Sequence, residues 1–493
     1  MIRPQSDYLK SVAELSRFIS ADSNIEVNFS GITSDSRAVE VGDLFVALPG
    51  AKIHGAEYID QVKTSGSVAV LTDQEGAKIV GEKLPVIVIS NPRRELGDIC
   101  SWFYDAPSSA IKIAGITGTN GKTTTTTILN QILKFAGKST GLIGTIGIEV
   151  GPETIPSNFT TPEASELQSL FATMRERHIS HVSMEVSSHA IEARRVSGTR
   201  FAMVGFTNLT QDHLDFHGDM ASYFSAKSKL FTPEYGELGL INIDDQYGKL
   251  LFDSASIPVI SLARENRSAQ WHYERIELKS AGYSVAIRGT SGVLIEGEIN
   301  LIGDHNLDNV LMAVAMALEF EIDPLVIANS LQSLRGAAGR LESVDLGQKF
   351  LALVDYAHTP DAVTRTLATL RKSVSGRIIC VLGCGGDRDK SKRPIMGAEL
   401  LAGSDQAIFT SDNPRSEDPE KILDEMVSGL NLKENSAVVV NRREAIALAV
   451  ASALPGDCVI VLGKGHETGQ EIAGTKLPFD DRIELARAIE ELG

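Results

Sequence analysis

The chain has 493 residues, of which 43% are hydrophobic and 23% are charged, and its formal net charge is -17 at pH 7. At roughly 150 residues per domain, this length predicts about three domains that can each bury a core. The acidic balance argues against a nucleic-acid-binding protein, because phosphate backbones require clustered lysine and arginine. We find no signal-peptide pattern, no apolar run near the roughly 18 residues of a membrane span, and no metal-binding cysteine pattern. We therefore expect a cytoplasmic protein with reduced cysteines, without membrane insertion and without nucleic-acid partners.

Three blocks follow one another along the chain. Residues 1–105 contain short strands and turns, and the stretch APSS then reads as a linker. In residues 106–335, β-rich runs alternate with helical stretches, and the glycine-rich LRGAAGR precedes the last block, residues 336–493. This alternation predicts an α/β protein with mainly parallel sheets.

The end of the middle block departs from the alternation. Two β-rich runs, at about 274–287 and 292–302, predict an antiparallel excursion on the sheet. A helix is expected to start near His305, because Val310, Leu311 and Val314 follow at helical spacing.

Four apolar strands of the last block each end in a polar loop. Their sequences are FLALVDYAHTPD, IICVLGCGGDRD, AIFTSDNPR and CVIVLGKGHE. Ligands of open parallel sheets bind outside the carboxyl ends of the strands. The four loops therefore predict one shared pocket.

The stretch IKIAGITGTNGKTTTTTILNQIL is typical of a phosphate-binding loop between a strand and a helix. Glycines let backbone N–H groups close around phosphates, and the helix N-terminus favours their charge. Lys122 is expected at the β- and γ-phosphates and Thr123 at Mg²⁺. Ile116 occupies the first glycine position of the usual spacing, so the match is incomplete.

Two acidic and histidine-rich segments follow in the middle block. Glu185 ends a β-rich run, where it is either a second Mg²⁺ ligand or a solvated carboxylate. Asp212, His213, Asp215 and His217 lie within six residues. Two histidines four apart could share one helix face and bind a metal, or this segment could be a helix cap with polar partners.

Ordered motifs along the chain resemble those of the Mur ligases of peptidoglycan synthesis. They are GTNGKTT, MEVSSH, TNLTQDHLDFH, the AK of FSAKSKLF, GDHNLDN, GRLE and DYAHTPDA, within a resemblance that runs from TSDSR to GKGHE. The resemblance implies three α/β domains. These are a small uridine-binding domain (1–105), a central P-loop ATPase domain with a mainly parallel sheet (106–335), and a Rossmann-like, amino-acid-binding domain (336–493).

The resemblance also implies the ATP and metal ligands. For ATP they are Gly118, Thr119, Asn120, Gly121, Lys122, Thr123, Thr124, Asn306 (at adenine), Arg340 and Asp355. One Mg²⁺ would bind Thr123 and Glu185, and a second would bind His213 and a carbamylated Lys227, whose modified group is an oxygen ligand suited to Mg²⁺. Lys122, Lys227 and His213 are the implied catalytic residues, and the role of His358 stays open.

The N-terminal signature TSDSRAVEVGDLFVALPG is similar to that of family members that add the third peptide residue, whose substrate is UDP-N-acetylmuramoyl-L-alanyl-D-glutamate. The implied contacts to this substrate are Ser34, Ser36, Asn158, Thr160, Thr161, Ser187 and Arg195. Ala193 stands where the family often has glutamine, and Phe159 separates Asn158 from the threonines.

The motif Asp412-Asn413-Pro414-Arg415 accompanies meso-2,6-diaminopimelate in this family, whereas lysine-adding members usually lack the arginine. Arg415 can bind the additional carboxylate of diaminopimelate through two parallel hydrogen bonds. The implied pocket comprises Arg388, Asp412, Asn413, Pro414, Arg415, Gly463 and Glu467.

The implied reaction is ATP-dependent amide formation through an acyl phosphate, carried out by a monomer with Mg²⁺ as cofactor. The alternatives are a lysine-adding ligase, a folylpolyglutamate synthetase, an ATP-hydrolysing switch protein and a metal-dependent phosphohydrolase.

Overall fold

The computed structural model describes residues 2–21, 24–50, 52–157, 159–279 and 282–492. The chain divides into two compact units. The first comprises Met1–Arg275, Val285–Gly297 and Asp308–Leu331, and the second comprises Ile276–Ser284, Glu298–Leu307 and Gln332–Gly493.

The first unit begins with a small parallel sheet of four strands in the order β3-β4-β5-β6. Successive residues of a strand point to opposite faces. Leu44 and Leu71 accordingly pack in one core with α1 and α4, while Phe45 and Val70 pack in another with α2. The elements are β1 (Lys10–Ser11), α1 (Val12–Phe18), β2 (Asn28–Phe29), β3 (Gly31–Thr33), β4 (Asp43–Val46), α2 (Ile59–Thr64), β5 (Ala69–Thr72), α3 (Gln74–Val80), β6 (Val86–Val88) and α4 (Pro92–Phe103).

An eleven-stranded sheet follows in the order β10-β9-β8-β11-β7-β12-β13-β14-β15-β16-β17. Its strands from β8 to β15 run parallel, and β9 and β10 are added antiparallel. The strands are β7 (Lys112–Thr117), β8 (Thr140–Gly144), β9 (Gly147–Val150), β10 (Glu153–Ile155), β11 (His181–Glu185), β12 (Met203–Phe206), β13 (Gly239–Asn242), β14 (Val259–Ala263), β15 (Trp271–Lys279), β16 (Gly282–Arg288) and β17 (Leu294–Ile299). The helices are α5 (Lys122–Phe135), α6 (Ala164–Glu176), α7 (Ser188–Glu192), α8 (Leu214–His217), α9 (Met220–Ser228), α10 (Gln246–Ser254), α11 (Asp304–Glu319) and α12 (Pro324–Ser330).

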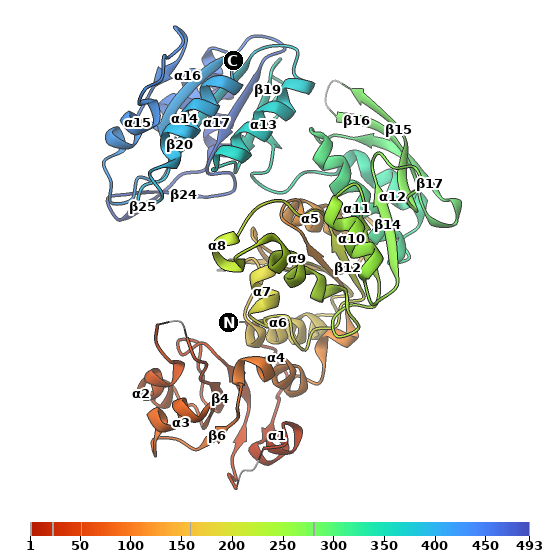
Figure 1. Cartoon of the computed structure of the whole chain (residues 1–493), viewed down its shortest axis with the longest axis vertical. Helices are drawn as coiled ribbons and strands as arrows, with labels where there is room; N and C mark the ends of the chain where they lie inside the picture. The colour runs from red at the N-terminus through yellow and green to blue at the C-terminus, as the bar shows by residue number, and fades with distance from the viewer. Residues whose placement is uncertain (1, 22–23, 51, 158, 280–281, 493) are drawn as a thin grey trace. The chain divides into compact units, whose positions relative to one another are not determined.

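The second unit is built on a six-stranded sheet, β18-β19-β23-β20-β21-β22, in which only the edge strand β18 is antiparallel. Its buried strands carry apolar residues on both faces, as expected for a sheet covered on both sides. Leu367 of α13 and Met396 of α14 belong to one core, and Ile446 of α16 and Leu485 of α17 belong to the other. Figure 1 shows these helices, coloured from teal (α13) to blue (α14, α16 and α17), around the sheet. The elements are β18 (Glu342–Ser343), β19 (Leu351–Asp355), α13 (Pro360–Ser373), β20 (Ile378–Cys384), α14 (Lys392–Gly403), β21 (Gln406–Ser411), α15 (Pro419–Val427), β22 (Ala437–Val438), α16 (Arg442–Ala451), β23 (Cys458–Leu462), β24 (Gly469–Ile472), β25 (Thr475–Pro478) and α17 (Asp481–Glu490).

The predicted α/β class is confirmed, and α11 begins at the expected place. The expected single run at 274–287 is wrong, because it contains parts of two neighbouring strands, β15 and β16. Gly282 opens β16 with a φ of 138°, and a Cβ there would lie 1.9 Å from the Ile299 carbonyl oxygen. This conformation favours glycine and marks the start of the second strand. Among the described residues, no helix has the length and apolar character needed to cross a bilayer.

Candidate active site

The predicted phosphate loop lies between β7 and α5. Gly121 precedes the helix with a φ of 87°, a left-handed conformation that glycine adopts readily. The Lys122 side chain folds back over the loop, where its Nζ donates to the carbonyl oxygens of Gly118 (2.9 Å) and Thr119 (3.0 Å). Because α5 has 14 residues and Gly121 has no side chain with which to cap it, its N-terminus is suited to a phosphate group.

The structure explains the missing first glycine. Ile116 lies inside β7, is fully buried, and its carbonyl accepts a hydrogen bond from Val186 N. The loop proper therefore starts at Gly118, which has a φ of 149°. A Cβ at Gly118 would lie 1.9 Å from Thr207 Oγ1, so the close approach of these segments requires glycine here.

Glu185 is buried at the carboxyl end of β11, next to the phosphate loop. Its Oε2 accepts a 2.9 Å hydrogen bond from Thr123 Oγ1, and its Oε1 accepts a 2.7 Å bond from Thr145 N. The carboxylate is 1% exposed, which excludes the solvated strand-end alternative. Thr123 and Glu185 thus place two oxygen ligands together, the type of donor that Mg²⁺ prefers.

Lys227 of α9 also reaches the phosphate loop. It is 1% exposed, and its Nζ donates a 2.9 Å bond to the Gly118 carbonyl that also accepts from Lys122. Burial lowers the pKa of Lys227 well below its usual value, and the charge of Lys122 lowers it further. A neutral amine is therefore accessible here at a lower pH than on a surface lysine.

The histidines of DHLDFH take separate positions. His213 is the N-cap residue of the four-residue helix α8 and has a φ of 53°, so the shared helix face is wrong and the helix-cap alternative is the one observed. The His213 ring lies 4.7 Å from the His189 ring and 6.1 Å from the Tyr223 ring, while His217 Nε2 lies 2.9 Å from Ser188 Oγ. Lys227 Nζ lies 4.7 Å from the same Tyr223 ring, so both expected metal-site residues lie near one aromatic group. No group of three or more His, Cys, Asp or Glu is arranged to hold a metal in the described part of the chain.

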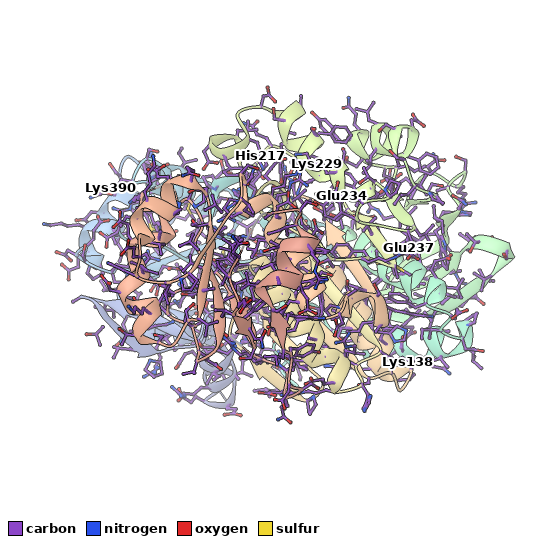
Figure 2. The ribbon with its side chains drawn as sticks, turned by 90° about the horizontal axis from the view of Figure 1, so that it is seen from below. Lys138, His217, Lys229, Glu234, Glu237 and Lys390 are labelled. Atoms are coloured by element: carbon purple, nitrogen blue, oxygen red, sulfur yellow. The ribbon has the colours of Figure 1, made fainter. Side chains whose placement is uncertain are left out.

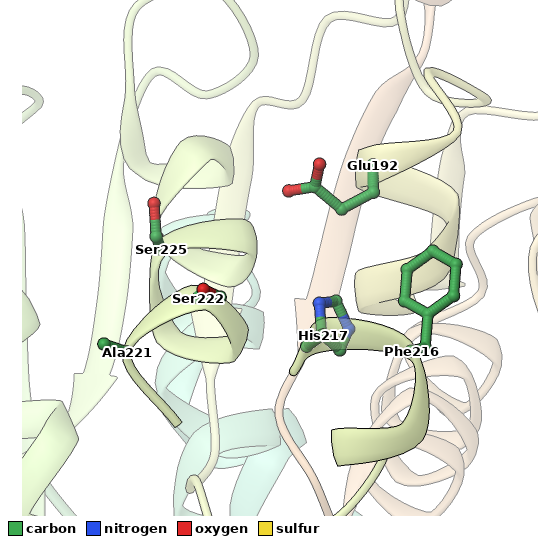
Figure 3. Close-up of a pocket in the computed structure, with 6 residues that line it drawn as sticks. All are labelled: Glu192, Phe216, His217, Ala221, Ser222 and Ser225. Carbon is green, nitrogen blue, oxygen red and sulfur yellow. The ribbon is translucent and has the colours of Figure 1, made fainter. Parts of the chain in front are cut away.

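A hollow of about 520 Å³ opens beside these histidines. Figure 3 shows Glu192, Phe216 and His217 on one wall and Ala221, Ser222 and Ser225 of α9 on the other. Glu192 is held by a 2.6 Å ion pair with Lys229. Figure 2 labels Lys229 and His217 in the same region of its view. The hollow is thus lined by α7, α8 and α9, the helices that also carry Ser188 and Lys227.

The residues expected at the UDP substrate form a second group in the first unit. Thr161 Oγ1 donates to the Glu185 carbonyl (2.9 Å) and accepts from Ser187 N (3.1 Å), and Thr160 Oγ1 lies 3.0 Å from Thr145 Oγ1. The threonines therefore adjoin Glu185. Asn158 lies outside the described residues.

Arg195 adjoins this group, whereas Ser34 contacts α6 and Ser36 contacts Gln61. Arg195 Nη1 donates to the Thr161 carbonyl (3.2 Å), and its Nε forms a 2.8 Å ion pair with Glu163. The carbonyl of Ala193, where the family often has glutamine, accepts a 3.3 Å bond from Arg93. Ser34 Oγ lies 3.1 Å from Ser165 Oγ of α6, and the Ser36 carbonyl accepts a 3.2 Å bond from Gln61.

The remaining nucleotide residues lie in the second unit. Asn306 is buried in the first turn of α11, and its Nδ2 donates to the Ile302 carbonyl (2.8 Å). The Asp355 carboxylate accepts hydrogen bonds from Leu341 N (2.8 Å) and Ala357 N (2.9 Å). Arg340 lies over the Tyr356 ring at 4.9 Å, and His358 Nδ1 lies 2.8 Å from the Tyr356 carbonyl oxygen.

The four polar loops of the second unit meet at one edge of its sheet. Gly463 N donates to the Asp355 carbonyl (3.1 Å), and Gly386 N donates to the Asn413 carbonyl (2.9 Å). Gly463 has a φ of 112°, and a Cβ there would lie 2.7 Å from Asp412 Oδ2. The strand ends thus lie together at one edge, and the shared pocket expected there stays a prediction.

Arg415 is fixed at this edge by both its backbone and its side chain. It has a φ of 52°, and its backbone bridges to β24, with Arg415 N donating to the Glu471 carbonyl (3.0 Å). Its Nη1 donates to the Gly386 carbonyl (2.7 Å), and its Nε lies 3.6 Å from Glu471 Oε2. Arg388 is exposed on the loop that contains Gly386.

Asp412, Asn413 and Glu467 form the acidic part of the same edge. Burial raises the pKa of Asp412, which the charges of Arg442 and Lys464 partly oppose. Asn413 N donates to Asp412 Oδ1 (2.7 Å), and Asn413 Nδ2 donates to Glu467 Oε2 (2.8 Å).

Three buried charged residues behind this edge were not predicted from the sequence. Arg442 and Asp481, each 0% exposed, form a bidentate pair with both N–O distances at 2.7 Å. Lys464 is also 0% exposed. Lys464 lies within GKGHE, and a lysine between two glycines after an apolar strand was a usable signal. Nothing in the local sequence marks Arg442 or Asp481.

Comparisons with known proteins place this geometry in a family. Residues 28–104 match the Mur ligase family catalytic domain, residues 116–317 the Mur ligase middle domain, and residues 339–465 the Mur ligase glutamate ligase domain.

Individual proteins similar to this chain can be aligned with it over nearly its whole length. The UDP-N-acetylmuramoyl-L-alanyl-D-glutamate--2,6-diaminopimelate ligase of Streptomyces avermitilis is 46% identical over 473 residues, covering 94% of this chain and 93% of the relative. The Streptomyces coelicolor protein of that name is 44% identical and covers 99% and 98%. A solved structure with the same name has a TM-score of 0.73 at 30% identity and covers 99% of each chain. The chain belongs to the Mur ligase family.

Proposed function

We propose that the chain is the ATP-dependent ligase that adds meso-2,6-diaminopimelate to UDP-N-acetylmuramoyl-L-alanyl-D-glutamate, giving the UDP-muramoyl tripeptide. The observation that carries this proposal is the edge that holds Arg415, Asp412 and Glu467 on converging loops. Diaminopimelate has a carboxylate and an ammonium group at each end. One planar cation and two carboxylates match this ligand, whereas lysine offers no second carboxylate to Arg415.

The roles of the residues follow from charge and position. Arg415, with Arg388, would bind the far carboxylate, Asp412 and Glu467 would bind ammonium groups, and Gly463 would supply a backbone contact. Asn413 and Pro414 complete the loop.

The phosphate loop supplies the nucleotide site. Gly118, Thr119, Asn120, Gly121, Lys122, Thr123 and Thr124 would surround the ATP phosphates, Asn306 would contact adenine, and Arg340 and Asp355 would reach the nucleotide. Lys122 already lies across the loop, where its charge can neutralise phosphoryl oxygens.

The residues near the phosphate loop fit Mg²⁺. Thr123 and Glu185 would hold one ion, and His213 with Lys227 would hold a second once the lysine amine has reacted with carbon dioxide and released a proton. The lowered pKa of Lys227 favours the neutral amine that this modification requires. Bound Mg²⁺ would neutralise charge that develops on the phosphoryl oxygens.

The first step is attack of the D-glutamate γ-carboxylate on the γ-phosphorus of ATP, which forms the acyl phosphate and releases ADP. The diaminopimelate amine then attacks the acyl carbon, and phosphate leaves as the amide forms. The protein mainly holds the reactants in place and surrounds the phosphoryl group with cations. Ser34, Ser36, Asn158, Thr160, Thr161, Ser187 and Arg195 would hold the UDP substrate.

The proposal includes three domains, 1–105 for the UDP substrate, 106–335 for ATP and 336–493 for the amino acid, in a monomer. Residues of the middle domain would also contact the UDP substrate, and Arg340 and Asp355 of the last domain would also reach ATP.

Phosphate release from ATP tests the function. The assay contains UDP-N-acetylmuramoyl-L-alanyl-D-glutamate and either meso-diaminopimelate or L-lysine, and product mass is measured in parallel. Release that depends on diaminopimelate, with the matching mass increase, supports the proposal. Activity with lysine alone would refute the Arg415 argument, and release indifferent to either amine would indicate a hydrolase or switch.

A further inference from the structure

Lys464 of the GKGHE loop is a buried lysine to which the proposed reaction gives no role. Its Nζ donates to three oxygens, Asn413 Oδ1 at 3.0 Å, Glu467 Oε2 at 3.1 Å and the Gly469 carbonyl at 2.7 Å. An ammonium group has three N–H donors, so protein groups use all of them. Any effect of Lys464 on a ligand must therefore pass through the groups that it holds.

Asn413 completes a bridge between Lys464 and Glu467. Its Oδ1 accepts from Lys464 and from Glu471 N (3.0 Å), and its Nδ2 donates to Glu467 Oε2 (2.8 Å). Two donors thus converge on one oxygen of Glu467, whose side chain is 35% exposed. One edge of this carboxylate is fixed by the protein, and the remainder can meet a ligand.

The same cluster sets the charge of Glu467. Burial raises the pKa of Glu467, but the charge of Lys464 and the hydrogen bonds from Asn413 and Lys464 lower it by more. The carboxylate therefore stays ionised to a lower pH than it would without the lysine.

We propose that Lys464 is a positioning residue of the amino-acid pocket, which through Asn413 holds the Glu467 carboxylate toward an ammonium group of the bound diamino acid. This inference rests on the proposed function of the pocket. A purely structural lysine would stabilise the fold equally well without influencing the amine substrate, and the two roles predict different kinetics.

The test compares Lys464→Met with the wild-type chain in the phosphate-release assay. Methionine has a similar length but no donor, so Glu467 loses its anchor. The KM for diaminopimelate should rise about 10- to 100-fold, as for other residues that orient a ligand-binding group. The KM values for ATP and the UDP substrate should not change. The acid limb of the pH profile of kcat/KM for diaminopimelate should move to higher pH, because the pKa of Glu467 would rise without the lysine.

Two further variants separate positioning from stability. Arg377→Met removes an ion pair with Asp457. These two residues precede β20 and β23, at the strand ends opposite to the amino-acid pocket. The variant should destabilise the unit without changing the KM for diaminopimelate. Glu467→Gln allows a double-mutant cycle between Lys464 and Glu467. If Lys464 acts through Glu467, the double variant Lys464→Met/Glu467→Gln should be no worse than Glu467→Gln alone.

The inference is overturned if Lys464→Met keeps the wild-type KM and acid limb, or if Arg377→Met raises the KM equally. Should Lys464→Met not fold, Lys464→Gln removes the charge while it keeps two N–H donors, and an unshifted acid limb in that variant would also overturn the inference. Wild-type protein that shows no diaminopimelate-dependent release would instead refute the proposed function, and the inference would fall with it.

Discussion

Replacing Arg442 by methionine should destabilise the second unit strongly. Arg442 begins α16 and Asp481 begins α17, and both side chains are fully buried. Besides the bidentate pair, Arg442 Nη1 donates to the Ser411 carbonyl (3.1 Å) and Nη2 to the Leu462 carbonyl (2.8 Å). These are the last residues of β21 and β23, so one guanidinium joins two helices and two strand ends.

The magnitude follows from what the substitution leaves behind. Arg442→Met keeps Asp481 buried without its partner, which costs about 3–5 kcal/mol of the free energy of unfolding. For a unit of about this size, each kcal/mol lowers Tm by roughly 2–4 °C, so the unit should melt about 6–20 °C earlier. The double variant Arg442→Met/Asp481→Leu should recover much of this loss, because an apolar pair removes the uncompensated charge.

Scanning calorimetry is the appropriate assay. Both tryptophans, Trp102 and Trp271, lie in the first unit, so tryptophan fluorescence would not report the transition of interest. Arg365→Met is the matched control, because Arg365 forms an i,i+4 pair with Asp361 in which the side chains are 55% and 72% exposed. This surface pair should contribute no more than about 0.5 kcal/mol.

Two outcomes would contradict this role of the Arg442–Asp481 pair. A loss below about 1 kcal/mol for Arg442→Met would mean that water or local rearrangement compensates Asp481. A double variant as unstable as the sum of the single variants would mean that the two residues act independently.

Three further predictions concern the sites and pH. Arg415→Lys should raise the KM for diaminopimelate about tenfold or more while leaving that for ATP unchanged, because one ammonium cannot copy a bidentate fork; unchanged diaminopimelate kinetics would contradict the assigned role. Glu185→Gln should raise the Mg²⁺ concentration for half-maximal phosphate release about tenfold, and an unchanged Mg²⁺ titration would argue against a metal ligand there. Burial lowers the pKa of His181 to about 4, and the charges of Lys112 and Lys138 lower it further. The folded state therefore binds this proton only at a lower pH than the unfolded state does. The free energy of unfolding should therefore decrease as the pH falls from 6.5 toward 4. In His181→Phe, the free energy of unfolding, measured by urea titration at each pH, should change less over this range.

The α/β class and the principal motifs could be predicted from the order of the residues alone. Glycines with a lysine and a threonine between an apolar strand and a helix have few other uses, so the phosphate loop was predictable from spacing. The polar ends of four apolar strands likewise predicted a shared edge, because parallel strands bring their carboxyl ends to the same side of a sheet.

Local patterns misplaced features that depend on backbone conformation. The i,i+4 spacing of His213 and His217 suggested one helix face, but His213 adopts a left-handed conformation before a helix of four residues. The 274–287 run suggested one strand, but Gly282 opens a second strand against the Ile299 carbonyl. Spacing cannot reveal either break, since both arise from contacts and dihedral angles of the folded chain.

Long-range contacts of the folded chain determine which charges are buried and what neutralises them. Arg442 and Asp481 are 39 residues apart, and Lys464 and Asn413 are 51 apart, so no local pattern pairs them. A charge enters the interior only when folding brings it a partner, because its desolvation is costly. The sequence therefore indicated the groups suited to contact a ligand, while the structure identified the buried residues that hold those groups in place.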